Sequence, residues 1–434
     1  MKMIIQVALV LFAVFFGSLV IGIPISIGIG LASIVTALCL VPSDVGIFIV
    51  AQKMVTGMSS FSLLAVPLFI FSGNIMNNGG IARRLVDFAK VIGGRIPGSL
   101  AHANVLGNML FGALSGSAVA SCAAIGGTMA PLEKEEGYDP AFSAAVNIAS
   151  APAGMLIPPS GVLILYSLVA GGVSVSALFI AGYIPGILMG LATMLVAYIY
   201  AKKHNYPVSD KISFKDGFKV FLGALPSLLL IVIVIGGIVG GAFTATEGAA
   251  IAVIYPLILS VIYKSITLVD LKDIILKTAV TTGVIMFLVA ASSAMSWVMA
   301  YAGIPGVISS AILSISTNKI VILLIINVTL LIVGTFMDLT PAVLIFTPIF
   351  LPIATELGLN PVHFGIILVF NLCIGIMTPP VGSVLFVGCG VANVSIEKVI
   401  KPLLPFFGAL IAVLMLITYV PAISLFLPKL FHLI

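Results

Sequence analysis

Charged residues are scarce in this chain of 434 residues. It has 19 Lys and Arg and 14 Asp and Glu, 8% in all, whereas an ordinary soluble domain has about 25%. A soluble protein of this length must cover its surface with polar groups, so the scarcity of charge excludes that class. The sequence also lacks a basic patch interleaved with aromatic residues, which a nucleic-acid-binding protein would need.

Cysteine is scarce as well. The four cysteines lie in apolar segments without the spacing of metal ligands, where a cysteine behaves as a small hydrophobe. They are Cys39, Cys122, Cys373 and Cys389. The sequence therefore predicts neither a disulfide nor a zinc site. It also lacks a grouping of Ser, His and Asp and a phosphate-binding loop, so we do not expect an enzyme.

Apolar residues dominate instead, at 61% of the chain. A transmembrane helix needs about 20 of them in succession. Several runs leave room for one or more such helices: Ile4–Val41, Val162–Tyr200, Val220–Tyr263 and Ile320–Ala354. The sequence thus predicts an all-α polytopic membrane protein. The first run is longer than the apolar core of a cleaved signal peptide, so we expect a retained first helix.

The charges gather in short stretches that we interpret as loops. Residues 77–98 contain four basic residues and one acidic residue, which under the positive-inside rule places this loop in the cytoplasm. Residues 201–219 form the longest hydrophilic break. We expect a linker at 206–218 that separates a first repeat, 1–205, from a second, 219–434.

The two halves share a pattern of glycine and proline. A shift of 221 residues aligns Pro131–Ser174 with Pro352–Ser395. Shared hydrophobicity does not readily explain why glycines and prolines match at this one fixed shift. The counterpart of the basic loop, 300–319, has one basic residue instead of four. This asymmetry favours repeats of inverted topology, as in secondary transporters, over parallel repeats.

Each repeat contains a helix break of the form Gly-x-x-x-Pro-Pro. The first runs from Gly154 to Pro159 and the second from Gly375 to Pro380, within broken helices expected at about 141–173 and 362–394. Proline has no N–H, so the carbonyls of Gly154 and Gly375 lose their helical partners. Unwound carbonyls at membrane depth are typical cation ligands in transporters. The alternative is a kink whose carbonyls bond to a neighbouring Ser or Thr.

A helical hairpin rich in small residues precedes each break. The hairpins are expected at about 99–130 and 320–351, with Ser115 and Ser117 at the tip of the first. Asp338 is at the tip of the second, in a segment without other charges, which makes it a candidate site residue. Alternatively, Asp338 caps the helix that follows it. For Glu247 we favour a capping role in the helix after Thr244.

Five motifs together resemble a known family. They are GALSGS at Gly112–Ser117, GYDP at Gly137–Pro140, IPPS at Ile157–Ser160, GTFMD at Gly334–Asp338 and MTPP at Met377–Pro380. In order and spacing, over nearly the whole chain, they resemble the large membrane (M, or DctM-like) subunit of tripartite ATP-independent periplasmic (TRAP) transporters.

The resemblance implies an elevator-type fold, in which a scaffold domain holds a mobile transport domain. It also implies two or more sodium ions as coupling ions. A first sodium site would use Ser115 and the backbone of Gly154, Ile157 and Pro158. A second would use Thr378 and the backbone of Gly334, Gly375 and Val381. Substrate would lie between the hairpin tips, near Ser117, Thr340 and Asp338.

The function that the resemblance implies is sodium-coupled import of an organic acid, of the sialic acid or C4-dicarboxylate class. The acid would be delivered by a periplasmic substrate-binding protein to a multi-pass protein of the bacterial inner membrane. Because the sequence begins directly with the M-like region, we expect a separate, small four-helix Q subunit. The alternatives are a stand-alone cation-coupled carboxylate symporter or antiporter, a channel and, more remotely, a membrane-embedded enzyme.

Overall fold

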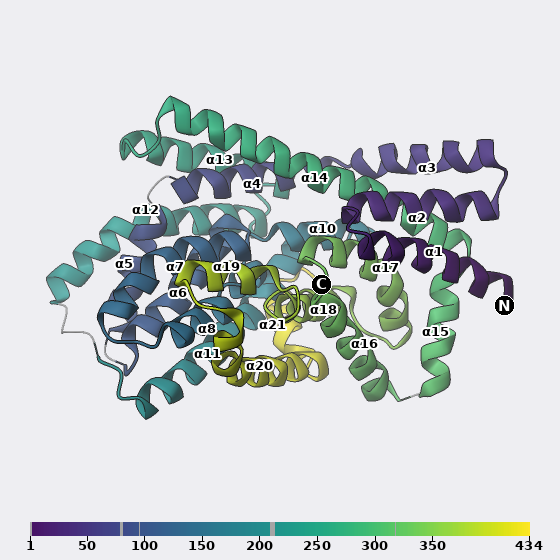
Figure 1. The fold of residues 1–434 in the computed structure, drawn as a ribbon. Helices are drawn as coiled ribbons and strands as arrows, with labels where there is room; N and C mark the ends of the chain where they lie inside the picture. Colours follow the sequence, from purple (N-terminus) through teal and green to yellow (C-terminus); the bar gives the residue numbers. More distant parts are fainter. Residues whose placement is uncertain (1, 79–80, 95, 209–212, 317) are drawn as a thin grey trace.

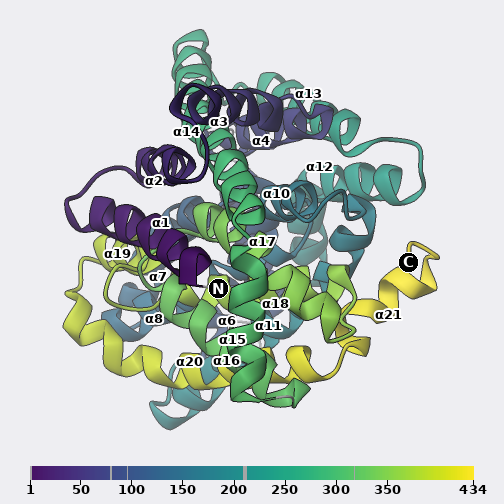
Figure 2. The same cartoon turned by 90° about the vertical axis from the view of Figure 1, so that its right-hand side faces the viewer.

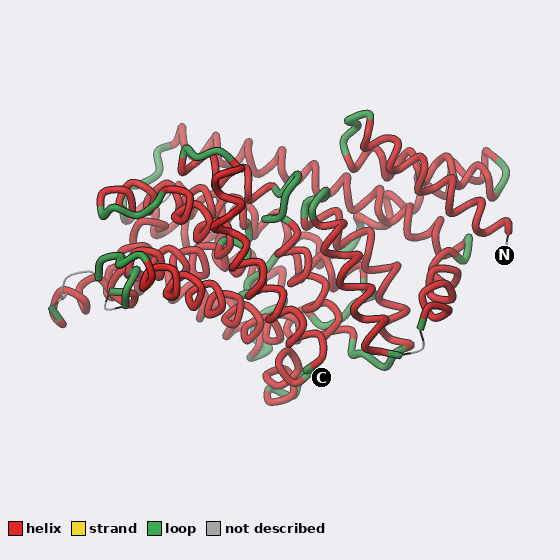
Figure 3. The backbone as a smooth tube through the Cα atoms, turned by 60° about the horizontal axis from the view of Figure 1, so that its bottom comes forward, coloured by secondary structure: helices red, strands yellow, loops and turns green. Residues whose placement is uncertain are grey.

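The computed structural model describes residues 2–78, 81–94, 96–208, 213–316 and 318–434. Throughout these ranges the chain forms helices joined by loops and turns, and no strand occurs in them (Figure 3). Helices satisfy their backbone hydrogen bonds internally, as an apolar surrounding requires. The prediction of an all-α protein is confirmed.

The first half of the chain contains the helices up to α11. They are α1 (Lys2–Val20), α2 (Ile25–Leu40), α3 (Ser43–Met58), η1 (Phe61–Leu64), α4 (Ala65–Asn78), α5 (Ile81–Gly93), α6 (Ser99–Ser115), α7 (Ala118–Glu135), α8 (Pro140–Ser150), α9 (Ala153–Leu156), α10 (Gly161–Val169) and α11 (Val175–Lys203).

The second half contains the remaining helices. They are α12 (Phe214–Val239), α13 (Ala245–Ile262), α14 (Leu268–Tyr301), α15 (Ile304–Ile315), α16 (Lys319–Gly334), α17 (Leu339–Glu356), α18 (Pro361–Gly375), α19 (Ser383–Ala392), α20 (Ile396–Tyr419) and α21 (Ala422–Leu430). Helix α12 therefore begins inside the expected linker 206–218, of which residues 209–212 lie outside the described residues.

Many of these helices are long and apolar enough to cross a membrane. In the described part of the chain, seven helices meet this condition, or up to nine if each of two bent pairs is one span. One bent pair is α8–α9 with α10, at an angle of 51°. The protein is therefore a multi-pass membrane protein, as the composition predicts.

Local sequence signals set where the helices begin. Asp139 and Asn360 precede α8 and α18, and their side-chain oxygens accept hydrogen bonds from the backbone N–H groups two residues on, at 3.0 and 2.8 Å. A proline follows each cap, and it fits the first helical position because the N–H there needs no partner. The two caps are 221 residues apart, so the repeat includes its helix-start signals.

Glu247 has the structural role that the sequence predicts. Its backbone N–H donates to the Thr244 hydroxyl at 3.2 Å, and its carboxylate accepts from the Thr244 backbone N–H at 2.8 Å. These reciprocal bonds form a capping box at the start of α13.

The helices form two groups. Helices α2, α3, α4, α13 and α14 lie together in the upper part of the molecule in both Figure 1 and Figure 2, where α14 packs against α2, α3 and α4, and α13 packs against α4. The hairpins and broken helices lie below them. Helix α5, which connects the two groups in the first repeat, packs against α12 and α6.

The repeat is also visible in three dimensions. Hairpin 1 is α6 with α7, and hairpin 2 is α16 with α17; they lie on opposite sides of the centre in Figure 1. The second arm of each hairpin packs against the broken helix of the other repeat, α7 against α19 and α17 against α10. This reciprocal packing, with tips converging from opposite sides, is the arrangement that an inverted repeat predicts.

The contact between repeats at Gly365 gives a first prediction. A Cβ atom there would lie 2.4 Å from Cε1 of Tyr166, a buried ring whose hydroxyl donates to the Pro361 carbonyl at 2.6 Å. We expect Gly365→Ala to lower the stability by about 1–3 kcal/mol through overpacking. The matched control is Gly127→Ala in α7, where a Cβ would meet nothing within 4 Å. Thermal unfolding in detergent measures both, and equal unfolding temperatures would contradict tight packing at Gly365.

Candidate functional site

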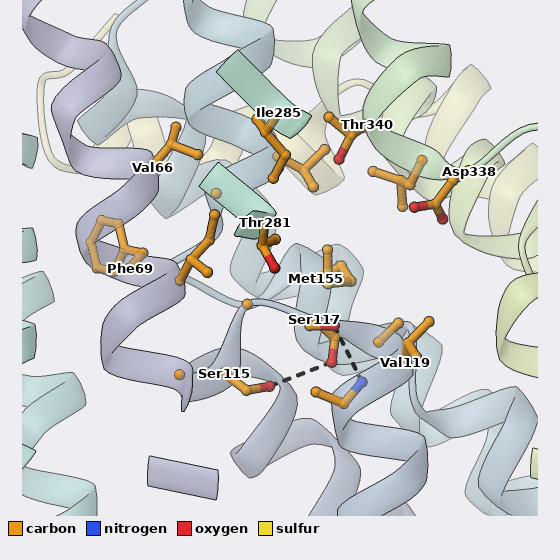
Figure 4. A pocket seen from close by; sticks show the side chains of 18 of the residues that line it. Val66, Phe69, Ser115, Ser117, Val119, Met155, Thr281, Ile285, Asp338 and Thr340 are labelled. Atoms are coloured by element: carbon orange, nitrogen blue, oxygen red, sulfur yellow. Dashed lines mark hydrogen bonds between the residues drawn. The ribbon is translucent and has the colours of Figure 1, made fainter. Parts of the chain in front are cut away.

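The tips of the two hairpins face one cavity of about 290 Å³ (Figure 4). Its walls come from both repeats and from both groups of helices: the α6–α7 tip, the start of α17, the start of α10, and one face each of α4 and α14. A cavity enclosed by converging broken elements is a typical place for a ligand.

The tip of hairpin 1 is shaped by a glycine and two serines. Gly116 has φ +63°, a left-handed conformation that a residue with a Cβ rarely adopts, and it ends α6. Ser117 then caps α7, because its hydroxyl accepts from the Ala120 N–H at 3.2 Å. The Ser115 hydroxyl donates to the Ser117 carbonyl at 3.4 Å. Both serines line the cavity.

The tip of hairpin 2 places Asp338 directly before α17. The residue holds the cap position, but its side chain makes no capping hydrogen bond. Instead its carboxylate accepts from the Ser383 hydroxyl, at the start of α19, at 3.3 Å. The capping alternative is therefore wrong for the side chain, which turns toward the second helix break. The three expected substrate residues, Ser117, Asp338 and Thr340, line the same cavity.

At the first break, the chain leaves helical geometry after α9. The Gly154 carbonyl has no hydrogen-bond donor among the described residues, whereas the Met155 carbonyl accepts from the Ser160 hydroxyl at 2.5 Å. Gly154 packs on hairpin 1, since a Cβ there would lie 2.3 Å from the Cα of Gly112. The two alternatives for a proline break thus coexist: one carbonyl is free and the next bonds to a serine.

The second break differs from the expectation. The Gly375 carbonyl accepts from the Thr378 N–H at 2.9 Å, and the Ile376 carbonyl accepts from the Val384 N–H at 3.1 Å. The expectation that prolines leave the Gly375 carbonyl without a donor is therefore wrong, because the chain turns tightly and offers N–H groups from further along. Each carbonyl oxygen keeps a second lone pair that a cation could use.

The residues expected at the second sodium site come together. A Cβ on Gly334 would lie 2.9 Å from the Cα of Gly375, the counterpart of the glycine contact in the first repeat. The Val381 N–H donates to the Thr335 carbonyl at 3.3 Å, which ties the second break to the tip of hairpin 2. The Thr378 hydroxyl donates to the Ile374 carbonyl at 2.7 Å.

The residues expected at the first sodium site are all buried, whereas Val381 of the second set is 48% exposed. Ile157 and Pro158 follow α9, and the Pro158–Pro159 peptide is cis, as is its counterpart Pro379–Pro380. Ser115 and Gly154 come from neighbouring elements, since α6 packs against α9. Of this set only Ser115 lines the cavity between the tips.

Sequence reasoning missed the polar residues that the upper helices contribute. Asn74 and Asn77 on α4 and Thr281 on α14 line the cavity, and Asn74 donates to Thr278 of α14 at 2.9 Å. The available signal was a pair of asparagines three residues apart in an apolar helix. Only the packing of α4 on α14 brings them to the cavity.

The cavity has few charges. Asp338 is the sole ionisable side chain among the described residues that line it, and Lys, Arg and His are missing from that lining. The N-terminal ends of α7, α10 and α17, which begin at Ala118, Gly161 and Leu339, lie at the cavity instead. Helix N-termini present free N–H groups and partial positive charge to anions.

Known proteins are similar to this chain over nearly all of its length. A Salmonella typhimurium protein, YgiK, described as uncharacterized, is 58% identical and covers 98% of this chain and 97% of its own. The isethionate TRAP transporter permease DctMQ of Oleidesulfovibrio alaskensis is 42% identical over 96% of this chain and 66% of its own. The sialic acid TRAP transporter large permease SiaM of Vibrio cholerae is 38% identical over 96% of this chain and 97% of its own.

A solved structure shares the fold. The YdaH transporter of Alcanivorax borkumensis, whose structure is described as having an unusual topology, superposes with a TM-score of 0.65. It covers 87% of this chain and 89% of its own at 14% identity, so the likeness concerns the fold alone.

The family description that matches the sequence is the DctM component of tripartite ATP-independent periplasmic transporters, over residues 12–423. Relatives in this family are named as transporter permeases, so the chain is not an enzyme. The chain belongs to the DctM component family of tripartite ATP-independent periplasmic transporters.

Proposed function

We propose that this protein imports a small organic anion, coupled to sodium, by an elevator-type movement of its hairpin-bearing half. The observation that supports this most is the cavity between the hairpin tips, where helix N-termini converge around a single carboxylate. The proposal includes a site for an anion, sites for cations and a route for moving both.

Anion binding follows from the helix ends. An organic acid in this cavity meets no basic side chain among the described lining residues, but it meets the N-terminal N–H groups of α7 and α17. These groups bind carboxylate or sulfonate oxygens. The hydroxyls of Ser117 and Thr340 add donors, and the asparagines of α4 add amide groups from the opposite wall.

Cation binding follows from the glycine contacts. The carbonyl of Gly154 is free of hydrogen bonds, and the Ser115 hydroxyl lies at the end of the adjoining helix. In the second repeat Gly334, Gly375, Thr378 and Val381 supply oxygens. Asp338 lies near this set, and its carboxylate alone would repel an anion. A cation between Asp338 and the anion therefore favours the binding of anion and cation together.

The elevator part of the proposal rests on the two groups of helices. Helix α4, in the upper group, approaches hairpin 1 so closely that a Cβ on Gly73 would lie within 2.4 Å of the Ser115 carbonyl oxygen. The cavity lies at this boundary, with α4 and α14 on one side and both tips on the other. A sliding movement along it would carry the anion and cations together.

The partners follow from the family. Family members are named for a periplasmic, ATP-independent, three-part system. We propose that a periplasmic binding protein delivers the anion and that a small Q subunit joins this chain in the bacterial inner membrane. The isethionate relative, named DctMQ, is longer than this chain. The substrate class that we propose is sialic acid or a C4-dicarboxylate, with a small sulfonate such as isethionate as a further member.

A prediction tests the cation site without knowledge of the substrate. Sodium chloride, but not choline chloride, should raise the unfolding temperature of the purified protein, because a ligand that binds only the folded state stabilises it. Asp338→Asn should weaken sodium binding about 5- to 30-fold, for a lost attraction of about 1–2 kcal/mol. The matched control is Asp273→Asn, an exposed acid on α14. An unchanged sodium titration in Asp338→Asn would remove Asp338 from the cation site.

A second prediction concerns coupling. With its Q and binding-protein partners in liposomes, the protein should take up radiolabelled sialic acid, succinate or isethionate only under an inward sodium gradient. Exchanging Gly375 for Ala should abolish uptake, because the added Cβ would lie 2.5 Å from the Cα of Gly334 and part the second break from hairpin 2. The control is Gly127→Ala, a position outside the cavity lining where a Cβ has open space. Uptake that persists without sodium would disprove the coupling.

A further inference from the structure

Glu133 is a buried acid far from the cavity between the tips. It lies near the end of α7, at the base of hairpin 1, and its side chain is 1% exposed. One carboxyl oxygen accepts from the Asn104 amide at 3.1 Å. The other, Oε2, has no hydrogen-bond partner. The Ser143 hydroxyl of α8, also buried, lies beside this carboxyl.

Charged and titratable groups surround Glu133 at a distance, but none of the described ones forms an ion pair with it. Around the carboxyl are Glu136, Tyr138 and Tyr206, none of them cationic. The other such groups on α7 and on the elements that pack against it are Arg83, Arg84, Asp87, Lys90, His102, Cys122, Lys134, Glu135 and Cys389. A buried carboxylate without a cation is costly, and such a group holds a proton instead.

The fold does not require an acid at this position. With the 221-residue shift, Glu133 corresponds to Ala354, which is fully buried at the equivalent place in α17 of hairpin 2. The same packing is thus achieved with a methyl group. An acid that packing does not need, and that has no charge partner, indicates a chemical role.

A chain of buried amides leads from Glu133 toward the first break. Asn108 donates to the Asn104 side-chain oxygen at 2.9 Å and is 2.8 Å from the Ser150 hydroxyl at the end of α8. Four residues after Ser150 comes Gly154, whose carbonyl is free. Hydrogen-bonded amides therefore connect Glu133 to Ser150, which precedes the proposed first cation site by about one helical turn.

A route for protons is also present. Ser143 lines a second cavity, of about 380 Å³, between the ends of α7 and α19 and the start of α20. Lys134 and Lys398 are exposed at its rim. This end of hairpin 1 adjoins α5, a helix where the sequence predicts a loop, in the basic stretch 77–98 that the positive-inside rule places in the cytoplasm. The Ser143 hydroxyl is itself buried, so Ser143 stands between Glu133 and this cavity.

We propose that Glu133 is a proton-binding site inside the hairpin-bearing half, which exchanges its proton with the cytoplasm through Ser143. In the protonated form the carboxyl O–H donates to the Ser143 hydroxyl. On release, the proton passes through that hydroxyl to water in the second cavity, and the carboxylate keeps its bond from Asn104. The next step rests on the proposed sodium function. The negative charge on Glu133 strengthens sodium binding at Gly154, so that sodium and the proton each lower the affinity for the other.

Infrared spectroscopy tests the proton site directly. The full-length protein should show the carbonyl stretching band of one protonated, solvent-shielded carboxyl, which Glu133→Gln removes and the exposed control Glu135→Gln retains. Ser143→Ala should keep the band but slow its shift on transfer into heavy water. This measurement needs neither sodium nor substrate. A spectrum unchanged by Glu133→Gln at every pH that the protein tolerates would overturn the proposal.

Sodium titrations at several pH values test the linkage. In the wild type, sodium affinity should fall about fivefold as the pH is lowered through the titration of Glu133, the lower end of typical coupling. The Glu133→Gln variant keeps a side-chain oxygen that can accept the hydrogen bond from Asn104. Its sodium affinity should be independent of pH. A pH effect of equal size in the variant would refute the linkage. If the wild type binds no sodium at all, the proposed function fails while the infrared result still decides the proton site.

Discussion

The structure depends on one constraint: a helix broken inside an apolar protein must find partners for the backbone groups that the break releases. Both repeats meet it in the same way, by packing a glycine of the break against a glycine of the adjoining hairpin, Gly154 on Gly112 and Gly375 on Gly334. Without side chains, the two backbones approach closely enough for the hairpin to cover the break. At the first break the Gly154 carbonyl still has no donor among the described residues, and this is where we propose that a cation takes the place of the missing N–H group.

That constraint produces a site whose charge balance is unusual for an anion carrier. The described lining offers helix N-termini, hydroxyls and amides, but a single charged group, and that group is the acid Asp338. Helix ends bind an anion weakly enough for release, whereas a fixed arginine would hold it. In the function that we propose, the missing attraction comes with the coupling ion. The sodium gradient would then control affinity, because the anion would be bound well only when the cation is present.

Glycine and proline residues that break or end helices made much of the fold predictable from the sequence. Glycine and proline act within a few residues, so the hairpins, the breaks and the Glu247 capping box could be inferred from spacing, but the side-chain cap considered for Asp338 does not form. The hydrogen bond of the Gly375 carbonyl could not be inferred, because its donor, the Thr378 N–H, comes into reach only where the chain turns tightly before the prolines. Nor could Asn77 and Thr281, which meet at the cavity only because α4 packs on α14, about two hundred residues away.

The two hairpins are related but differ in their interiors. The first arm of hairpin 2 takes part in a neutral network, in which Asn371 of α18 donates to Asn327 of α16 at 2.9 Å and Asn327 donates to Thr418 of α20 at 3.0 Å. Hairpin 1 has amides in a similar setting, but its chain ends at Glu133. If the repeats are inverted, the bases of the hairpins face opposite sides of the membrane, and the ionisable end faces the cytoplasm alone. Under the proposals above, Glu133 would make the response to pH one-sided, because the matching buried position in hairpin 2 is Ala354.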